Sequence, residues 1–191
     1  MGTLIVRAIV LLSLPVVVFL GGAYLMQRLG DPSQLRETIQ KEKHLKGLGL
    51  RCTGYDLAAV KTYWGALHEK DKRMDVERRM LEIDLLFPFF YGAAFAGALL
   101  CAWVGLGRPF HPVWILAPLF IEVVADWTEN LIQLSQLRLF VGSEAALQPG
   151  WIQFASIATI VKVWLFYVSY LLVVGLVVWM IFSNWPRSPA R

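Results

Sequence analysis

Residues 122–130 (EVVADWTEN) bring charged and amide side chains into a run that otherwise has the composition of a membrane span. Glu122, Asp126 and Glu129 are spaced by four and then three residues, so a helix places them on one stripe, with Asn130 beside it. Lipid does not solvate carboxylates, and the stripe must therefore face other helices or a wet cavity. These groups could bind a polar or cationic molecule, pair with a basic side chain, or transfer a proton.

Three further polar side chains are expected to reach the same half of the membrane from neighbouring spans. Asp84 stands at the start of the second apolar run, and Tyr91 follows it on the same helical face. Lys162 lies ~16 Å into the last apolar run if that helix begins near residue 151. The predicted ligand-binding residues are Asp84, Tyr91, Glu122, Asp126, Glu129, Asn130 and Lys162.

Most of these residues also have a simpler explanation. Lys162 could extend its ammonium group to the interface, Asp84 could cap a span, and Glu129 and Asn130 could lie among lipid headgroups. Asp126 and Glu122 are harder to explain in this way, because a central acid costs ~3 kcal/mol on insertion unless it is paired or protonated. An ion pair between Asp126 and Lys162 would offset part of that cost. Their direct contact would indicate a packing role, whereas a cavity reaching Asp126 would indicate a ligand.

No metal site and no cofactor are predicted. The histidines, His44, His68 and His111, are scattered along the chain, and the ExxH pairs of carboxylate-bridged metal sites do not occur. Patterns of the CxxC, HExxH, GxGxxG and Walker types are also absent from the sequence. Cys52 lies in a polar segment and Cys101 in the middle of a span, so a disulfide is not expected.

The composition is that of a polytopic membrane protein. Of the residues, 57% are hydrophobic and 17% are charged, against roughly 45–50% and about 25% in soluble domains. The hydrophobic residues form runs of about 20, the length that a helix needs to cross a bilayer core of ~30 Å. We therefore predict an all-α bundle of four transmembrane helices in one membrane domain, residues 1–191, with the lipid bilayer as its environment and no nucleic-acid partner. The predicted spans are residues 8–27, 85–106, 113–134 and 152–183.

The segment 28–80, between the first two spans, is polar and basic. It predicts a helical layer on the membrane surface, with a solvated loop as the alternative. One helix is expected to open with Asp31 as its N-cap and Pro32 at its first position. A second helical pattern follows from about Tyr55.

The distribution of charge predicts the orientation. Four spans put both termini on one side, and the opposite side holds thirteen Lys and Arg residues against four. The positive-inside tendency then places the loop 28–80 in the cytoplasm and both termini on the other side. A cleaved signal peptide is the alternative for the first apolar run, but its length and its single preceding charge, Arg7, favour a retained span.

Two motifs stand out: DLLFPFFYG at residues 84–92 and ADWTEN at residues 125–130. With GYDLAAVKTYWGAL upstream and ASIATIVKVWL downstream, they resemble a family of uncharacterised four-span membrane proteins, in which D-x-x-F-P-x-x-Y-G precedes a D-x-x-E-N helix and a later Lys. The resemblance covers most of residues 54–170 and implies no activity. A looser similarity to the EXPERA-type domain of emopamil-binding sterol isomerases suggests, by analogy, a small-ligand pocket.

Two functions are predicted from this arrangement. The first is a polar half-membrane pocket, open toward the loop side, that binds a lipid-like or amphipathic small molecule. Its walls would include Phe87, Phe90, Trp127 and Trp164, and in a catalytic version Asp126 or Glu129 would act as general acid or base. The second is a non-enzymatic accessory or assembly subunit, whose buried charges serve helix packing with a membrane protein partner. A through-path for ions is disfavoured because the other half of the spans is apolar.

Overall fold

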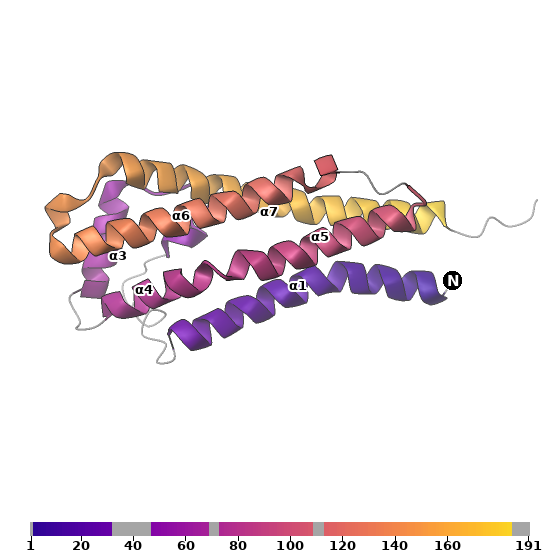
Figure 1. The fold of residues 1–191 in the computed structure, drawn as a ribbon, viewed down its shortest axis with the longest axis horizontal. Helices are drawn as coiled ribbons and strands as arrows, with labels where there is room; N and C mark the ends of the chain where they lie inside the picture. The colour runs from indigo at the N-terminus through magenta and orange to yellow at the C-terminus, as the bar shows by residue number, and fades with distance from the viewer. Residues whose placement is uncertain (1, 32–46, 69–72, 109–112, 185–191) are drawn as a thin grey trace, which may run out of the picture.

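Four long helices run side by side along the long axis of the protein in the computed structural model (Figure 1). The structure describes residues 2–31, 47–68, 73–108 and 113–184. The long helices are α1 (Gly2–Gly30), α5 (Phe87–Gly105), α6 (Ala117–Gly142) and α7 (Pro149–Ser183). Shorter elements are the 3₁₀ turns η1 (Leu48–Leu50), η2 (Val113–Leu116) and η3 (Glu144–Ala146) and the helices α3 (Leu57–His68) and α4 (Arg73–Asp84). The described residues are thus helical with short turns, as predicted.

The start of α1 and the end of α7 lie at one end of this bundle, and α3 and α4 lie at the other (Figure 1). We call the end with α3 and α4 the loop end, because it carries the described part of the segment 28–80. Helix α3 confirms the helical pattern predicted from about Tyr55. The helix predicted to open at Asp31 lies outside the described residues.

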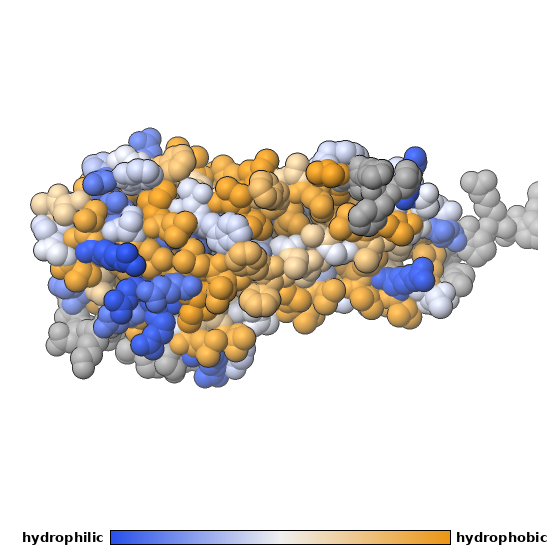
Figure 2. Space-filling model, viewed as in Figure 1, coloured by the Kyte–Doolittle hydropathy of each residue, from blue (hydrophilic) through white to orange (hydrophobic). Residues whose placement is uncertain are grey.

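Three helical stretches are long and apolar enough to cross a membrane. They are α1, the stretch Met74–Gly105 formed by α4 and α5, and α7. On the face shown in Figure 2, hydrophobic residues cover most of the bundle, and strongly hydrophilic ones gather mainly at the loop end. These features indicate an integral membrane protein. Helix α6, which carries the acidic stripe, is not among the three.

Helix α6 differs in its bounds from the predicted span 113–134. It begins at Ala117, after the 3₁₀ turn η2, and continues to Gly142. The extension forms because Leu137 and Phe140 continue the helical period and are buried. The connection from α6 to α7 is therefore shorter than the interval between the predicted spans 113–134 and 152–183.

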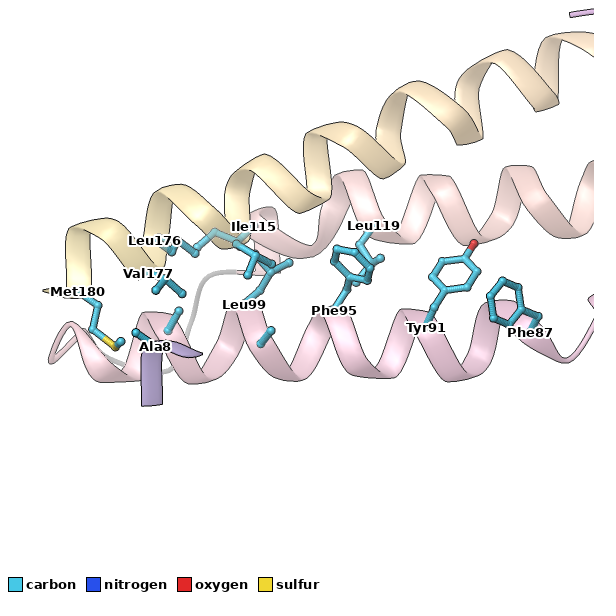
Figure 3. Packing of buried hydrophobic residues seen from close by; sticks show 13 residues of the cluster. Ala8, Phe87, Tyr91, Phe95, Leu99, Ile115, Leu119, Leu176, Val177 and Met180 are labelled. Atoms are coloured by element: carbon cyan, nitrogen blue, oxygen red, sulfur yellow. The ribbon is translucent and has the colours of Figure 1, made fainter. Parts of the chain in front are cut away.

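Two separate hydrophobic cores hold the helices together. The first, which we call the membrane core, lies between α1, α5, α6 and α7 and includes Phe95, Leu99, Leu119 and Val177 (Figure 3). The second, the loop-end core, joins α3 to the loop-end parts of α6 and α7. Its members include Leu48, Val60, Trp64, Leu134, Leu137, Phe140 and Ile152. The two cores leave between them the stretch of α6 that carries the acidic stripe.

Glycine allows close contacts between helices of the bundle, as at Gly22 and Gly92. A β-carbon on Gly22 of α1 would collide with the ring of Phe87 on α5. Because glycine has no side chain, α1 can pack closely against α5 at this point. A β-carbon on Gly92 of α5 would lie 3.1 Å from Val123 on α6. The approach at Gly92 is the close packing that small residues allow between membrane helices. Gly97, also on α5, has nothing within 4 Å of its β-position.

Candidate functional site

The polar residues form one layer between the two hydrophobic cores. On α6, Leu119 belongs to the membrane core and Leu134 to the loop-end core, and the buried acids lie between them. Along α7 the cores follow in the opposite order. Ile152 belongs to the loop-end core and Val173 to the membrane core, and Thr159 and Lys162 lie between them. We call these groups the polar layer. Its members are Tyr55, Asp84, Tyr91, Glu122, Asp126, Glu129, Asn130, Gln133, Thr159, Lys162 and Ser169.

Lys162 joins α7 to α6 through two ion pairs. Its Nζ lies 2.8 Å from Oδ1 of Asp126 and 2.6 Å from Oε2 of Glu129. The side chain of Lys162 is 15% exposed, that of Asp126 8% and that of Glu129 0%. This geometry confirms the predicted pair between Asp126 and Lys162, and it places Lys162 in the bundle interior rather than at the interface. The alternative placement of Glu129 among headgroups does not fit its burial.

Asp126 is the most connected acid of the layer. Its Oδ2 accepts a hydrogen bond from the Tyr91 hydroxyl at 3.0 Å, and its Oδ1 accepts one from Asn130 Nδ2 at 3.3 Å. Tyr91 thereby links α5 to α6; the sequence predicts only that Tyr91 shares a helical face with Asp84 and lies in the same half of the membrane. Asp84 itself is half-buried at the end of α4, within interaction range of Asp126 and Asn130.

Glu122 lies on the membrane-core side of the layer, one helical turn from Asp126. It is 2% exposed, and its Oε2 accepts a hydrogen bond from the hydroxyl of Ser169 on α7 at 3.3 Å. In the part of the chain that the structure describes, the ion pairs to the acids of this layer come from Lys162. Among the described residues, the layer thus holds four carboxyl groups, those of Asp84, Glu122, Asp126 and Glu129, and one ammonium group, which pairs with the last two.

The segment Gly47–Tyr55, which we call the strap, lies against the loop-end side of the layer. Tyr55 was not predicted as a site residue, yet its hydroxyl accepts a hydrogen bond from Gln133 Nε2 at 3.0 Å. Gln133 Nε2 also donates to Glu129 Oε1 at 2.7 Å, which connects the strap to the ion-paired acids. Burial raises the pKa of the Tyr55 phenol above its ordinary value, and the charge of Glu129 adds to the rise. Tyr55 therefore remains a neutral hydrogen-bonding group at physiological pH.

The aromatic side chains around the layer differ from those predicted. Phe90 and Trp164 are 64% and 61% exposed, so they lie on the outer surface of the bundle and not in a pocket wall. Phe87 is buried as predicted, and its ring centroid lies 5.1 Å from that of Tyr91. Phe19 of α1 also contacts Tyr91, at a centroid distance of 5.9 Å. Aromatic rings from α1 and α5 thus pack against the ring of Tyr91.

The structure brings all seven predicted site residues into or beside the polar layer. The strap residue Tyr55 was missed because a glycine-rich segment has no periodicity from which a facing side could be assigned. Among the described residues, no group of three or more His, Cys, Asp or Glu side chains is placed to hold a metal ion.

Comparisons of this chain with protein-family models, with curated proteins and with solved structures find no match. The resemblance to a four-span family therefore stays a prediction. Any function must be argued from the polar layer itself.

Proposed function

We propose that this protein is a four-span membrane protein whose polar layer binds the positively charged head of a lipid-like or amphipathic small molecule. The observation that carries the proposal is the surplus of acid over base in a buried place. Glu122 and Glu129 are 2% and 0% exposed, and Lys162 supplies the one ammonium group that the described residues give to the layer. Buried carboxylates without a counter-charge are costly, and a cationic head or bound protons would remove that cost.

The surface of α6 supports its role as the fourth span. Phe120, Ile121, Val124 and Leu131 are 69%, 50%, 40% and 56% exposed, while the acids of the same helix are buried. A helix in water would turn these faces the other way. In lipid, the apolar face meets acyl chains and the polar face meets the bundle. The acids lower the mean hydropathy of α6, which is why hydropathy alone does not identify it.

A second candidate function rests on a different observation. Lys162 contacts Asp126 directly, at 2.8 Å, and this is the contact expected if the charges serve helix packing. In that case the protein is an accessory or assembly subunit, and its layer only fixes α7 against α6. The two candidate functions differ in whether they explain the burial of Glu122. Its hydrogen bond comes from Ser169 and not from a base, so a packing role gives no reason to bury this acid.

Native mass spectrometry of the protein released from its own membrane separates these functions. The pocket predicts a co-purified amphiphile of discrete mass that is lost in Glu122→Gln and Asp126→Asn. The variant Glu144→Gln is the matched control, because Glu144 is exposed in η3. A stoichiometric protein partner without any bound small molecule would contradict the pocket and support the accessory subunit.

In either case we propose that the loop end faces the cytoplasm and that both termini lie on the other side. The excess of Lys and Arg in the segment 28–80 supports this orientation. The placement of the start of α1 and the end of α7 at the same end of the bundle is compatible with it.

A further inference from the structure

The strap covers the loop-end side of the ion-paired residues at close range. A β-carbon built on Gly49 would lie 3.5 Å from Glu129 Oε1 and 3.6 Å from Lys162 Nζ. A side chain at position 49 would therefore begin in van der Waals contact with the charged atoms, and the backbone of the strap passes close to them. The neighbouring Leu48 is 1% exposed and anchors the strap in the loop-end core.

A second attachment holds the other end of the strap to α7. Gly54 has a positive φ of 78°, and a β-carbon there would lie 2.5 Å from Ser156 Oγ. The next residue, Tyr55, donates its backbone N–H to the same Ser156 hydroxyl at 2.8 Å. Glycine is therefore needed at position 54 both for the backbone conformation and for the approach to α7.

Apart from the 3₁₀ turn η1, the strap is irregular backbone and is not part of any long helix. Its backbone hydrogen bonds within this stretch are local, from Arg51 to Leu48 and from Gly54 to Arg51. Among the described residues, its contacts with the long helices include the hydrogen bonds at Tyr55 and the packing of Leu48, Gly49 and Gly54. No helix has to unwind when these contacts break. Opening a segment between helices costs less free energy than unfolding the core.

We propose that the strap is a displaceable cover that controls entry to the polar layer from the loop end. Among the described residues, the strap lies over Lys162 on this side, so a molecule that approaches from the loop end reaches the layer only after the Tyr55 hydrogen bonds have broken. The role of the strap as a gate rests on the proposed function, which supplies the molecule that enters. The geometry of the cover does not depend on it.

Thr159 offers a reporter beneath the strap. It is 0% exposed and lies within hydrogen-bonding range of both Tyr55 and Glu129. In a Cys52→Ser/Cys101→Ser background, Thr159→Cys places a thiol of similar size there. The measurement is the rate at which a small, water-soluble anionic methanethiosulfonate modifies this thiol in protein reconstituted in nanodiscs, where both faces are open to water.

Gly54→Ala is the variant that releases the strap, and Gly107→Ala is its matched control. Both glycines have a positive φ, 78° and 69°, but the β-position of Gly107 has nothing within 4 Å. We expect Gly54→Ala to raise the modification rate of the thiol at position 159 at least tenfold and Gly107→Ala to leave it unchanged. Equal rates with and without Gly54→Ala, whether both fast or both slow, would overturn the proposal.

Hydrogen–deuterium exchange of the wild-type chain provides a second test without any cysteine. The backbone amide of Tyr55 is expected to exchange at least tenfold faster than the amides of α6 around Glu129, because the strap opens on its own. Exchange of both segments at the same rate would show that the strap leaves only when the bundle unfolds, and it would overturn the proposal. Neither measurement uses a ligand, so a failed gate and a failed ligand pocket remain distinguishable.

Discussion

Replacing Lys162 by Met should destabilise the bundle more than replacing either of its acidic partners. Lys162 holds two acids at 2.8 and 2.6 Å, so Lys162→Met leaves both Asp126 and Glu129 buried without their counter-charge. Asp126→Asn or Glu129→Gln removes one acid and leaves the other ion pair in place. The order of the three variants therefore follows from the sharing of one base by two acids.

The size of the effect can be worked from the distances. At an effective dielectric constant of about 20, each pair attracts with roughly 6 kcal/mol, most of which is offset by the desolvation of the ions. Breaking a buried pair by removing one partner costs about 3–5 kcal/mol. We expect Lys162→Met to fall at the upper end of this range. Each single acid substitution should cost about half as much.

The assay is reversible unfolding in mixed micelles with an increasing fraction of denaturing detergent. Lys61→Met on α3 is the control for the loss of a lysine. The triple variant Lys162→Met/Asp126→Asn/Glu129→Gln should recover at least half of the loss, because it removes the buried charges together. If Lys162→Met is as stable as Lys61→Met, or if the losses in the triple variant simply add, the ion-paired cluster does not hold α6 to α7.

Two further predictions concern the orientation and the packing of the bundle. Cys52, which is exposed in the strap, should react with a membrane-impermeant maleimide added on the cytoplasmic side. Cys101, in α5, should not react from either side. Labelling of Cys52 from the outside would reverse the proposed orientation. Gly22→Leu should cost about 1–3 kcal/mol of unfolding free energy by overpacking against Phe87, whereas Gly21→Leu, with nothing within 4 Å of its β-position, should be neutral. Equal losses for these two variants in the same unfolding assay would argue against the docking of α1 through Gly22.

The polar layer could be predicted because its residues carry information in their spacing and depth. The stripe of Glu122, Asp126 and Glu129 follows the helical period. Within a membrane, only the interior of a helix bundle can accommodate these carboxyl groups. Lys162 could be added because it enters its span from the same end. The ion pair between Lys162 and Asp126 then followed from charge alone, and the structure shows it.

The remaining features could not be predicted, for physical reasons that differ. Phe90 and Trp164 were assigned to the pocket, but in helices that are apolar on all sides the sequence does not tell which face meets lipid. The extension of α6 to Phe140 was missed because it packs against the distant helix α3 rather than against lipid. The position of Tyr55 depends on the path of the strap, which is set by tertiary contacts.

The central claim, that the polar layer receives a cationic head, is tested most directly by comparing amphiphiles that share one alkyl chain but differ in headgroup. Binding of trimethylammonium, neutral and sulfate amphiphiles would be measured as the increase in unfolding free energy of the protein in nanodiscs. We predict that the cationic amphiphile alone stabilises the protein, by about 2.7 kcal/mol at a hundredfold excess over Kd. Glu122→Gln should weaken its binding about tenfold, and Glu144→Gln should leave it unchanged. Equal stabilisation by the three headgroups, or none by the cationic one, would contradict the account.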